Sequence, residues 1–296
     1  MNKLSAAERA HILQLLCEGM SIRAIERTTG SSKHTIERLL NDAGQALGGY
    51  QDRALRGIAA KRVQVDEIWS FTYAKAKNVA TAKAAPEWAG DTWTWTAIDA
   101  DSKLVISWLV GGRDSEYAIA FMDDLASRLS NRVQLTSDGH RAYLEAVEGA
   151  FGGDIDYATL EKIYATDPAA TRGRYSPPVC TGAKKRRVEG DPDPRHVSTS
   201  YVERQNLTMR MHMRRFTRLT NGFSKKVEHH ANAVALHFAY YNFVRVHKTL
   251  RMTPAMAAGV TDRLWEMSDL VGVLEAHEAA NAKSTVRGPY RKRAAA

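Results

Sequence analysis

Three acidic residues, Asp66, Asp138 and Glu203, are the side chains of this sequence best placed to do chemistry together. Asp66 lies within the apolar stretch RVQVDEIWSF, Asp138 follows RVQLTS and precedes a glycine, and Glu203 lies near the start of a helical stretch. Carboxylates that converge in a buried place repel one another unless a cation neutralises them. Oxygen ligands that leave positions open for water and phosphate are typical of magnesium. The three acids therefore predict a magnesium site.

Two magnesium ions at such a site would define its chemistry. Held about 4 Å apart, they can clamp the attacking and the leaving oxygen of a phosphodiester. One ion also lowers the pKa of the attacking water or hydroxyl, so the protein needs no histidine base. We therefore expect metal-dependent phosphoryl transfer.

Glu67 and His140 are neighbours of these acids. Side chains alternate between the faces of a strand, so Asp66 and Glu67 are expected to point opposite ways and not to serve one site together. Glu67 could support the site from behind or pair with a lysine, and we favour a structural role. His140 follows Asp138-Gly139 and either touches DNA or is exposed to water at the start of a helix.

An arginine stripe follows Glu203 along the predicted helix. Seven residues are almost two helical turns, so Glu203 and Arg210 share one face, and Arg214 and Arg218 continue it at intervals of four. A carboxylate followed by arginines could hold a metal and then the DNA backbone. The alternative is a solvated basic stripe.

Alternating strands and helices are expected to carry the acids between residues 60 and 220. Period-two and helical spacings predict strands at 62–71, 92–97, 103–110, 132–137 and 159–164, and helices at 115–129 and 140–150. The first three strands should form an antiparallel meander. Residues 165–199 contain five prolines and are expected to be an irregular basic insertion. Its run Lys184-Lys185-Arg186-Arg187 could grip phosphates or could be a solvated loop.

Three short helices precede this region. Ser5 and Glu8 fit a capping box, and a tight turn at 29–32 precedes the third helix, as in a helix-turn-helix. Four residues at the start of that helix would face the major groove: Lys33, His34, Thr35 and Arg38. The alternative is a small helical bundle for protein contacts. Residues 1–48 would form this domain, and glycines between 44 and 57 suggest a linker at 49–60.

The remaining segments are mostly helical. A helix is expected from Ser200 and a longer one from Lys225 to about His247, and Thr253-Pro254 should begin another. The catalytic domain would span residues 61–260. Residues 261–296 would form a C-terminal helix and a basic tail, which we expect to be disordered.

The charge of the chain favours a polyanionic partner. Its formal net charge is +9 and its pI about 9.5, for which nucleic acid is the default candidate. The two cysteines, Cys17 and Cys180, cannot build a disulfide framework or a zinc cluster. Without a signal peptide or an apolar membrane span, we expect a cytoplasmic, nucleoid-associated protein with no membrane partner.

The motifs VDEIW, TSDGH and ERQNLTMR, in this order after a helix-turn-helix, resemble bacterial insertion-sequence transposases of the DDE type. YYNFVRVHKTLRMTPAMAAGV (240–260) is similar to their common YNxxRxHxxL…TP segment. The resemblance implies an α/β, ribonuclease H-like (integrase-like) mixed sheet flanked by helices. It also implies Asp66, Asp138 and Glu203 as the metal-binding triad, Arg210 as the basic residue after the glutamate, and two Mg²⁺ ions.

Further expectations follow from the same resemblance. The helix-turn-helix would bind terminal inverted repeats, and the catalytic site would cleave and transfer DNA strands between element ends and target. A homodimer or a larger synaptic assembly would bring two ends together. Two other functions remain open: a structure-selective nuclease on the same fold, and a DNA-binding regulator that does not transpose. The long gap before Glu203 and the absence of a zinc-binding module depart from the pattern of some relatives.

Overall fold

A six-stranded mixed sheet forms the centre of the molecule. The computed structural model describes residues 3–165, 179–217 and 221–282. The strands lie in the order β3-β2-β1-β4-β5-β6. They are β1 (Arg62–Thr72), β2 (Gly90–Asp99), β3 (Val105–Gly111), β4 (Gln134–Ser137), β5 (Asp156–Ala165) and β6 (Val179–Glu189).

The strand directions agree with the predicted architecture. β1, β2 and β3 form the expected antiparallel meander. β4 runs parallel to β1, β5 runs parallel to β4, and β6 returns antiparallel to β5. This mixed sheet, flanked by helices, confirms the α/β, ribonuclease H-like arrangement that the resemblance implies.

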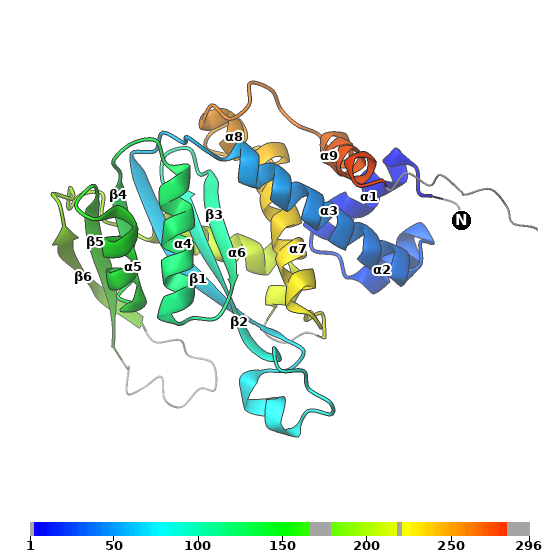
Figure 1. Ribbon diagram of the computed structural model, residues 1–296, viewed down its shortest axis with the longest axis horizontal. Coiled ribbons are helices and arrows are strands. Elements are labelled where there is room, and N and C mark those ends of the chain that lie inside the picture. The colour runs from blue at the N-terminus through cyan, green and yellow to red at the C-terminus, as the bar shows by residue number, and fades with distance from the viewer. Residues whose placement is uncertain (1–2, 166–178, 218–220, 283–296) are drawn as a thin grey trace, which may run out of the picture.

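Helices cover both faces of the sheet (Figure 1). On one face α4 (Ser115–Arg128) and α5 (Ala142–Phe151) pack over Val63 and Val65 of β1. On the other, α6 (Ser200–His212) and α7 (Val227–Ala239) share a second core with Ile68. Successive β1 side chains thus enter different cores, which is why the strand is apolar on both faces.

The N-terminal helices pack against α7 and do not form a detached unit. They are α1 (Ala6–Cys17), α2 (Ile22–Thr29) and α3 (Lys33–Ala54), and they share one core with α7 and with α9 (Met267–Ala280). The predicted capping box of Ser5 and Glu8 is present. In Figure 1 these helices lie together with α9 at one end of the molecule, away from β6.

The linker expected at 49–60 is wrong over its first half, because α3 continues to Ala54. The first of the glycines that suggested it, Gly44, serves close packing. A Cβ atom at Gly44 would lie 2.4 Å from the backbone oxygen of Asn232 in α7. Gly44 therefore allows two helices to approach, and it does not mark a flexible connection.

The irregular insertion expected at 165–199 is also wrong in part. Residues Val179–Glu189 form β6, which pairs with β5 along the edge of the sheet. The prolines of the sequence precede and follow this strand, so they do not interrupt its ladder. Charged side chains at an exposed edge strand also oppose pairing with other chains.

The C-terminal helices are shorter than expected. α7 passes into a π-helical turn at Tyr240–Val244, so the helix predicted to reach His247 ends three residues earlier. Thr253 caps α8 (Pro254–Ala257), as expected. The basic tail beyond residue 282 lies outside the described residues. In the described part of the chain, no helix combines the length and apolar character needed to cross a membrane.

Candidate metal centre

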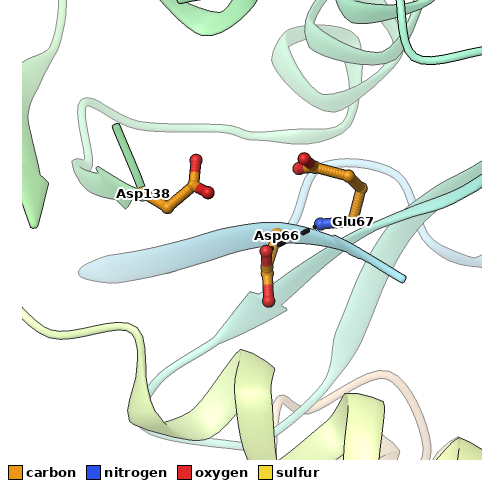
Figure 2. A group of neighbouring side chains, drawn as sticks. All are labelled: Asp66, Glu67 and Asp138. Atoms are coloured by element: carbon orange, nitrogen blue, oxygen red, sulfur yellow. Dashed lines mark hydrogen bonds between the residues drawn. The ribbon is translucent and has the colours of Figure 1, made fainter. Parts of the chain in front are cut away.

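Two adjacent parallel strands bring Asp66 and Asp138 together. Gln64 of β1 is paired with Thr136 of β4; Asp66 lies two residues further along β1, and Asp138 lies directly after the end of β4. Carboxylate oxygens of Asp66, Glu67 and Asp138 lie within 4.8 Å of one another (Figure 2). The structure therefore unites two of the three predicted ligands at one edge of the β1–β4 pair.

Asp138 is held by the turn that follows β4. Its Oδ1 accepts a hydrogen bond from the backbone N–H of His140 at 2.9 Å. The His140 ring stacks on Trp95, and its Nε2 lies 3.3 Å from the carbonyl oxygen of Arg113. His140 thus lies beside the acids and is fixed by packing.

Asp66 lies in an environment that disfavours its charged form. It accepts hydrogen bonds from the N–H of Glu67 at 2.9 Å and from the side-chain amide of Asn206 at 2.8 Å. Burial, followed by the charges of Glu67, Asp138 and Glu203, raises the pKa of Asp66 from 3.8 to about 7. In the described ranges, no lysine, arginine or histidine forms an ion pair with Asp66 or Asp138. A divalent cation would supply the missing positive charge, so these residues fit a magnesium site.

Glu67 points to the opposite side of β1 from Asp66, as predicted (Figure 2). The expectation that this keeps Glu67 away from the site is wrong, because its carboxylate lies within 4.8 Å of those of Asp66 and Asp138. Its side chain is 1% exposed, and one oxygen accepts a hydrogen bond from Arg113 Nε at 2.8 Å. The other accepts from the hydroxyl of Tyr143 at 2.9 Å. Burial is the main cause that raises the pKa of Tyr143, so the phenol stays protonated and keeps donating. Both Glu67 oxygens are therefore engaged, which suits a structural role despite their proximity to the aspartates.

Glu203 lies on α6 and is not one of these three carboxylates. One of its oxygens accepts a hydrogen bond from the hydroxyl of Thr199 at 2.6 Å, and the other pairs with Lys162 of β5. Its negative charge still acts on Asp66. The predicted convergence of three acids is therefore partial: Glu203 borders the site, with Lys162 as its counter-charge.

Asn206 and Gln64 join α6 to β1, and we did not predict either from the sequence. Asn206 donates to Asp66, and its own Oδ1 is buried without a partner among the described residues. Gln64 Oε1 accepts hydrogen bonds from the backbone N–H groups of Tyr201, at 2.8 Å, and Val202. The signals were their positions, since Gln64 shares a strand face with Asp66 and Asn206 follows Glu203 by three residues.

The arginine stripe continues only as far as Arg210. That side chain is exposed on the same helix as Glu203. α6 ends at His212 because Met213 adopts an extended backbone, so Arg214 lies in a separate 3-10 turn. The predicted spacing of four on one helix is therefore wrong for Arg214, and Arg218 lies outside the described residues.

The other predicted DNA contacts are accessible side chains on two separate surfaces. Lys33, His34, Thr35 and Arg38 are all exposed at the start of α3. Lys184, Lys185, Arg186 and Arg187 are exposed on the edge strand β6. Lys185 donates to the carbonyl oxygen of Pro194, and Arg187 lies 3.5 Å from Asp191. Their roles in DNA binding remain predictions.

Comparisons with known proteins give only distant structural matches. No protein-family model matches the sequence, and no curated protein matches it. A cryo-EM structure of the piggyBac transposase synaptic complex with hairpin DNA matches 95% of this chain and 73% of its own, at 10% identity and a TM-score of 0.39. The Mos1 transposase paired-end complex with left transposon end matches 50% of this chain and 58% of its own, at 15% identity and a TM-score of 0.19. A pre-cleavage Mos1 transpososome matches 53% of this chain and 60% of its own, at 14% identity and a TM-score of 0.19.

Proposed function

We propose that this chain is a DDE-type transposase of a bacterial insertion sequence, which cleaves DNA at the ends of its element and joins them to target DNA. One observation carries the proposal. Asp66 of β1 and Asp138, directly after the parallel strand β4, meet without an ion-pair partner among the described residues, while Asn206 ties Asp66 to the helix of Glu203. Such a group of acids suits divalent cations and phosphoryl transfer.

Asp66, Asp138 and Glu203 would hold two Mg²⁺ ions. When bound, the ions supply charge neutralisation at the phosphate and a lower pKa for the attacking water or hydroxyl. The side chains themselves orient the site: Asn206 fixes the Asp66 carboxylate, and the turn after β4 fixes Asp138. Glu203 would exchange its pairing with Lys162 for a metal ligand role.

The DNA contacts proposed for this function lie on several elements. Arg210 is exposed near the site and would bind a phosphate. The start of α3 would read the terminal inverted repeats, and the basic run of β6 would contact the duplex backbone. Because two element ends must be cut together, a homodimer or larger assembly is expected to form on DNA.

The experiment that tests the proposal uses the purified chain and a plasmid that carries the DNA flanking its gene. We expect Mg²⁺-dependent cleavage that leaves 3′-hydroxyl ends at the element boundaries, and no cleavage in EDTA. Pre-cut ends with a free 3′-hydroxyl should then be joined to a target plasmid. Cleavage without joining would indicate a nuclease, and binding without cleavage would indicate a regulator.

A further inference from the structure

The segment Arg245–Met252 follows the π-helical turn and forms a closed loop beside α6. The N–H of His247 donates to the carbonyl of Met252 at 2.9 Å, and the N–H of Arg251 donates to the carbonyl of His247 at 2.8 Å. Arg251 adopts a left-handed backbone with φ of 57°. Its side chain and that of Lys248 are exposed.

Cations from three separate elements lie along α6 beside this loop, since Lys103 contacts the Tyr201 ring of α6 and Arg245 contacts His212 at its end. Lys103 comes from the turn between β2 and β3, Arg204 from α6, and Arg245 from the loop itself. Burial, followed by the charges of Lys103, Arg245 and Arg204, lowers the pKa of His247. Arg245 is held in place by His212 at the end of α6, with 2.8 Å between Nη1 and Nε2. The fold therefore places several cationic side chains around this loop.

In the part of the chain that the structure describes, one carboxylate borders this group: Glu18 lies 3.8 Å from His212, the partner of Arg245. Lys103, Arg204 and Arg245 form no ion pair there, whereas Arg128 and Arg263 each pair with an aspartate. Arg204 is exposed, Lys103 and Arg245 are half-buried, and Lys103 donates to the carbonyl of Ala100. A group of cations without ion-pair partners of their own is suited to an anionic ligand.

The two acids nearest in sequence to Lys103 are already engaged. Asp99 accepts hydrogen bonds from the backbone N–H groups of Asp101 and Ser102, at 3.1 and 3.0 Å. Asp101 pairs with Arg62. They do not supply the counter-charge that the loop lacks.

The cationic group and the metal centre flank the same turn of α6. Lys103 Nζ lies 3.3 Å from the ring centroid of Tyr201, two residues before Glu203. Arg204 follows Glu203 directly, about 100° further around the helix. An anion bound by Lys103 and Arg204 would therefore lie on the helix face next to that of Glu203, within the same helical turn.

We propose that Lys103, Arg204 and the loop Arg245–Met252 form a phosphate-binding subsite that holds the DNA backbone beside the metal centre. The inference rests on the proposed function, because it takes DNA as the ligand. Lysine and arginine donate to phosphodiester oxygens and read no bases, so the subsite binds DNA without sequence preference.

The test compares the variant R204Q/K103Q with the full-length wild-type chain. The probe is a fluorescein-labelled duplex of arbitrary sequence, titrated in EDTA at several KCl concentrations. Each phosphate contact contributes roughly 0.9 to the slope of log affinity against log salt, so the double variant should lose about two units. The conservative variant R204K/K103R should keep the wild-type slope.

The matched control R56Q/R263Q removes the same net charge from two arginines that pair with aspartates. Its slope should stay at the wild-type value, and an equal fall in both double variants would overturn the subsite. An unchanged slope in R204Q/K103Q would overturn it too. The single variant R204Q, with an exposed helical side chain, should lose about one unit and provides the same test if the double variant does not fold.

The salt dependence of DNA binding, measured in EDTA, does not depend on whether the chain cleaves DNA. A loss of slope in a protein without Mg²⁺-dependent cleavage would support the subsite and contradict the transposase. Normal cleavage by wild type, with no change of slope in the variants, would contradict the subsite alone.

Discussion

Asp66 and Glu67 are adjacent in β1, yet their carboxylates lie in opposite electrostatic surroundings. Asp66 receives hydrogen bonds from two neutral groups and is surrounded by negative charge. Glu67 is buried on the other side of the strand, where Arg113 neutralises it and Tyr143 donates to it. Two adjacent residues of one strand thus carry two kinds of carboxylate: one is surrounded by negative charge, and the other is paired with an arginine.

This difference in surroundings indicates that the two acids have different roles. A buried carboxylate with its own cation needs nothing further and holds the surrounding elements together. A buried carboxylate among other carboxylates is destabilising until an external cation arrives. We therefore assign Asp66 to the metal and Glu67 to the support of β1, and each substitution below tests that assignment.

The largest effect is expected from Asp138→Asn. An amide at this position keeps the shape of the side chain and removes one of the two charges that meet between β1 and β4. We expect Mg²⁺-dependent cleavage to fall by about a hundred- to a thousandfold, the range typical of removing one group that stabilises charge in the transition state. Binding of end-containing DNA in EDTA should be unchanged, as measured by fluorescence anisotropy.

Asp123→Asn is the matched control, because Asp123 is an exposed carboxylate on α4. It should cleave DNA at the wild-type rate. Cleavage by Asp138→Asn at a rate near wild type would show that Asp138 is not a catalytic residue. The proposed metal centre would then lose its ligand at the end of β4.

The next largest effect is expected from Asn206→Ala. Its amide orients Asp66, and residues that orient metal ligands typically contribute 10–100-fold to metal affinity. We expect Mg²⁺ affinity to fall by roughly this factor, measured by isothermal titration calorimetry. Thr208→Ala, which removes a hydroxyl bonded to its own helix, should leave the affinity unchanged. Equal Mg²⁺ affinities for Asn206→Ala and Thr208→Ala would mean that Asn206 contributes to packing and does not orient Asp66 for the metal.

The strands and the acids could be predicted from the sequence because both depend on local patterns of residue spacing and sequence motifs. Period-two spacing placed β1 to β5, and the motif around Asp138 placed an acid at a strand end. β6 was missed because prolines and a run of four basic residues lower the apparent strand propensity. Gly44 of α3 was misinterpreted because the reason for it lies in another helix: Asn232 of α7, which it contacts, is 188 residues away in sequence.

The partners of the acids could not be predicted because they come from distant segments. Lys162 reaches Glu203 from β5, and Arg113 reaches Glu67 from the loop before α4. Strand alternation predicted that Asp66 and Glu67 face apart, but not which of them would receive a cation. That choice depends on tertiary packing.

A smaller effect is expected on stability, with opposite signs for the two neighbours. Glu67→Gln removes the charge that pairs with Arg113, and we expect it to lower the free energy of unfolding by about 1–2 kcal/mol, since the arginine is partly exposed. Asp66→Asn removes a repelled charge, so at pH 8 in EDTA it should leave the free energy unchanged or raise it. Urea denaturation measures both.

The control for these two substitutions is Asp154→Asn, an exposed acid 3.5 Å from Arg132, which should change stability by less than about 1 kcal/mol. A loss of stability in Asp66→Asn as large as in Glu67→Gln would show that both carboxylates are structural, and the division between them would fail.

The last effect is a pH dependence of stability that isolates Asp66. Its pKa rises from 3.8 to about 7 on folding, so the folded state binds this proton more tightly than the unfolded state. The resulting stabilisation is present below pH 4 and is lost as the pH rises toward 7 and beyond.

In EDTA, the melting temperature of wild type relative to Asp66→Asn should therefore fall by several degrees between pH 4 and pH 8, at roughly 2–4 °C per kcal/mol. The difference between the two proteins cancels the titrating groups that do not interact with Asp66, so it reports on Asp66 and the acids coupled to it. Saturating Mg²⁺ should raise the wild-type melting temperature more at pH 8 than at pH 5, because the ion competes with the proton for the same carboxylate. A difference that does not vary with pH would mean that Asp66 is ionised without a metal.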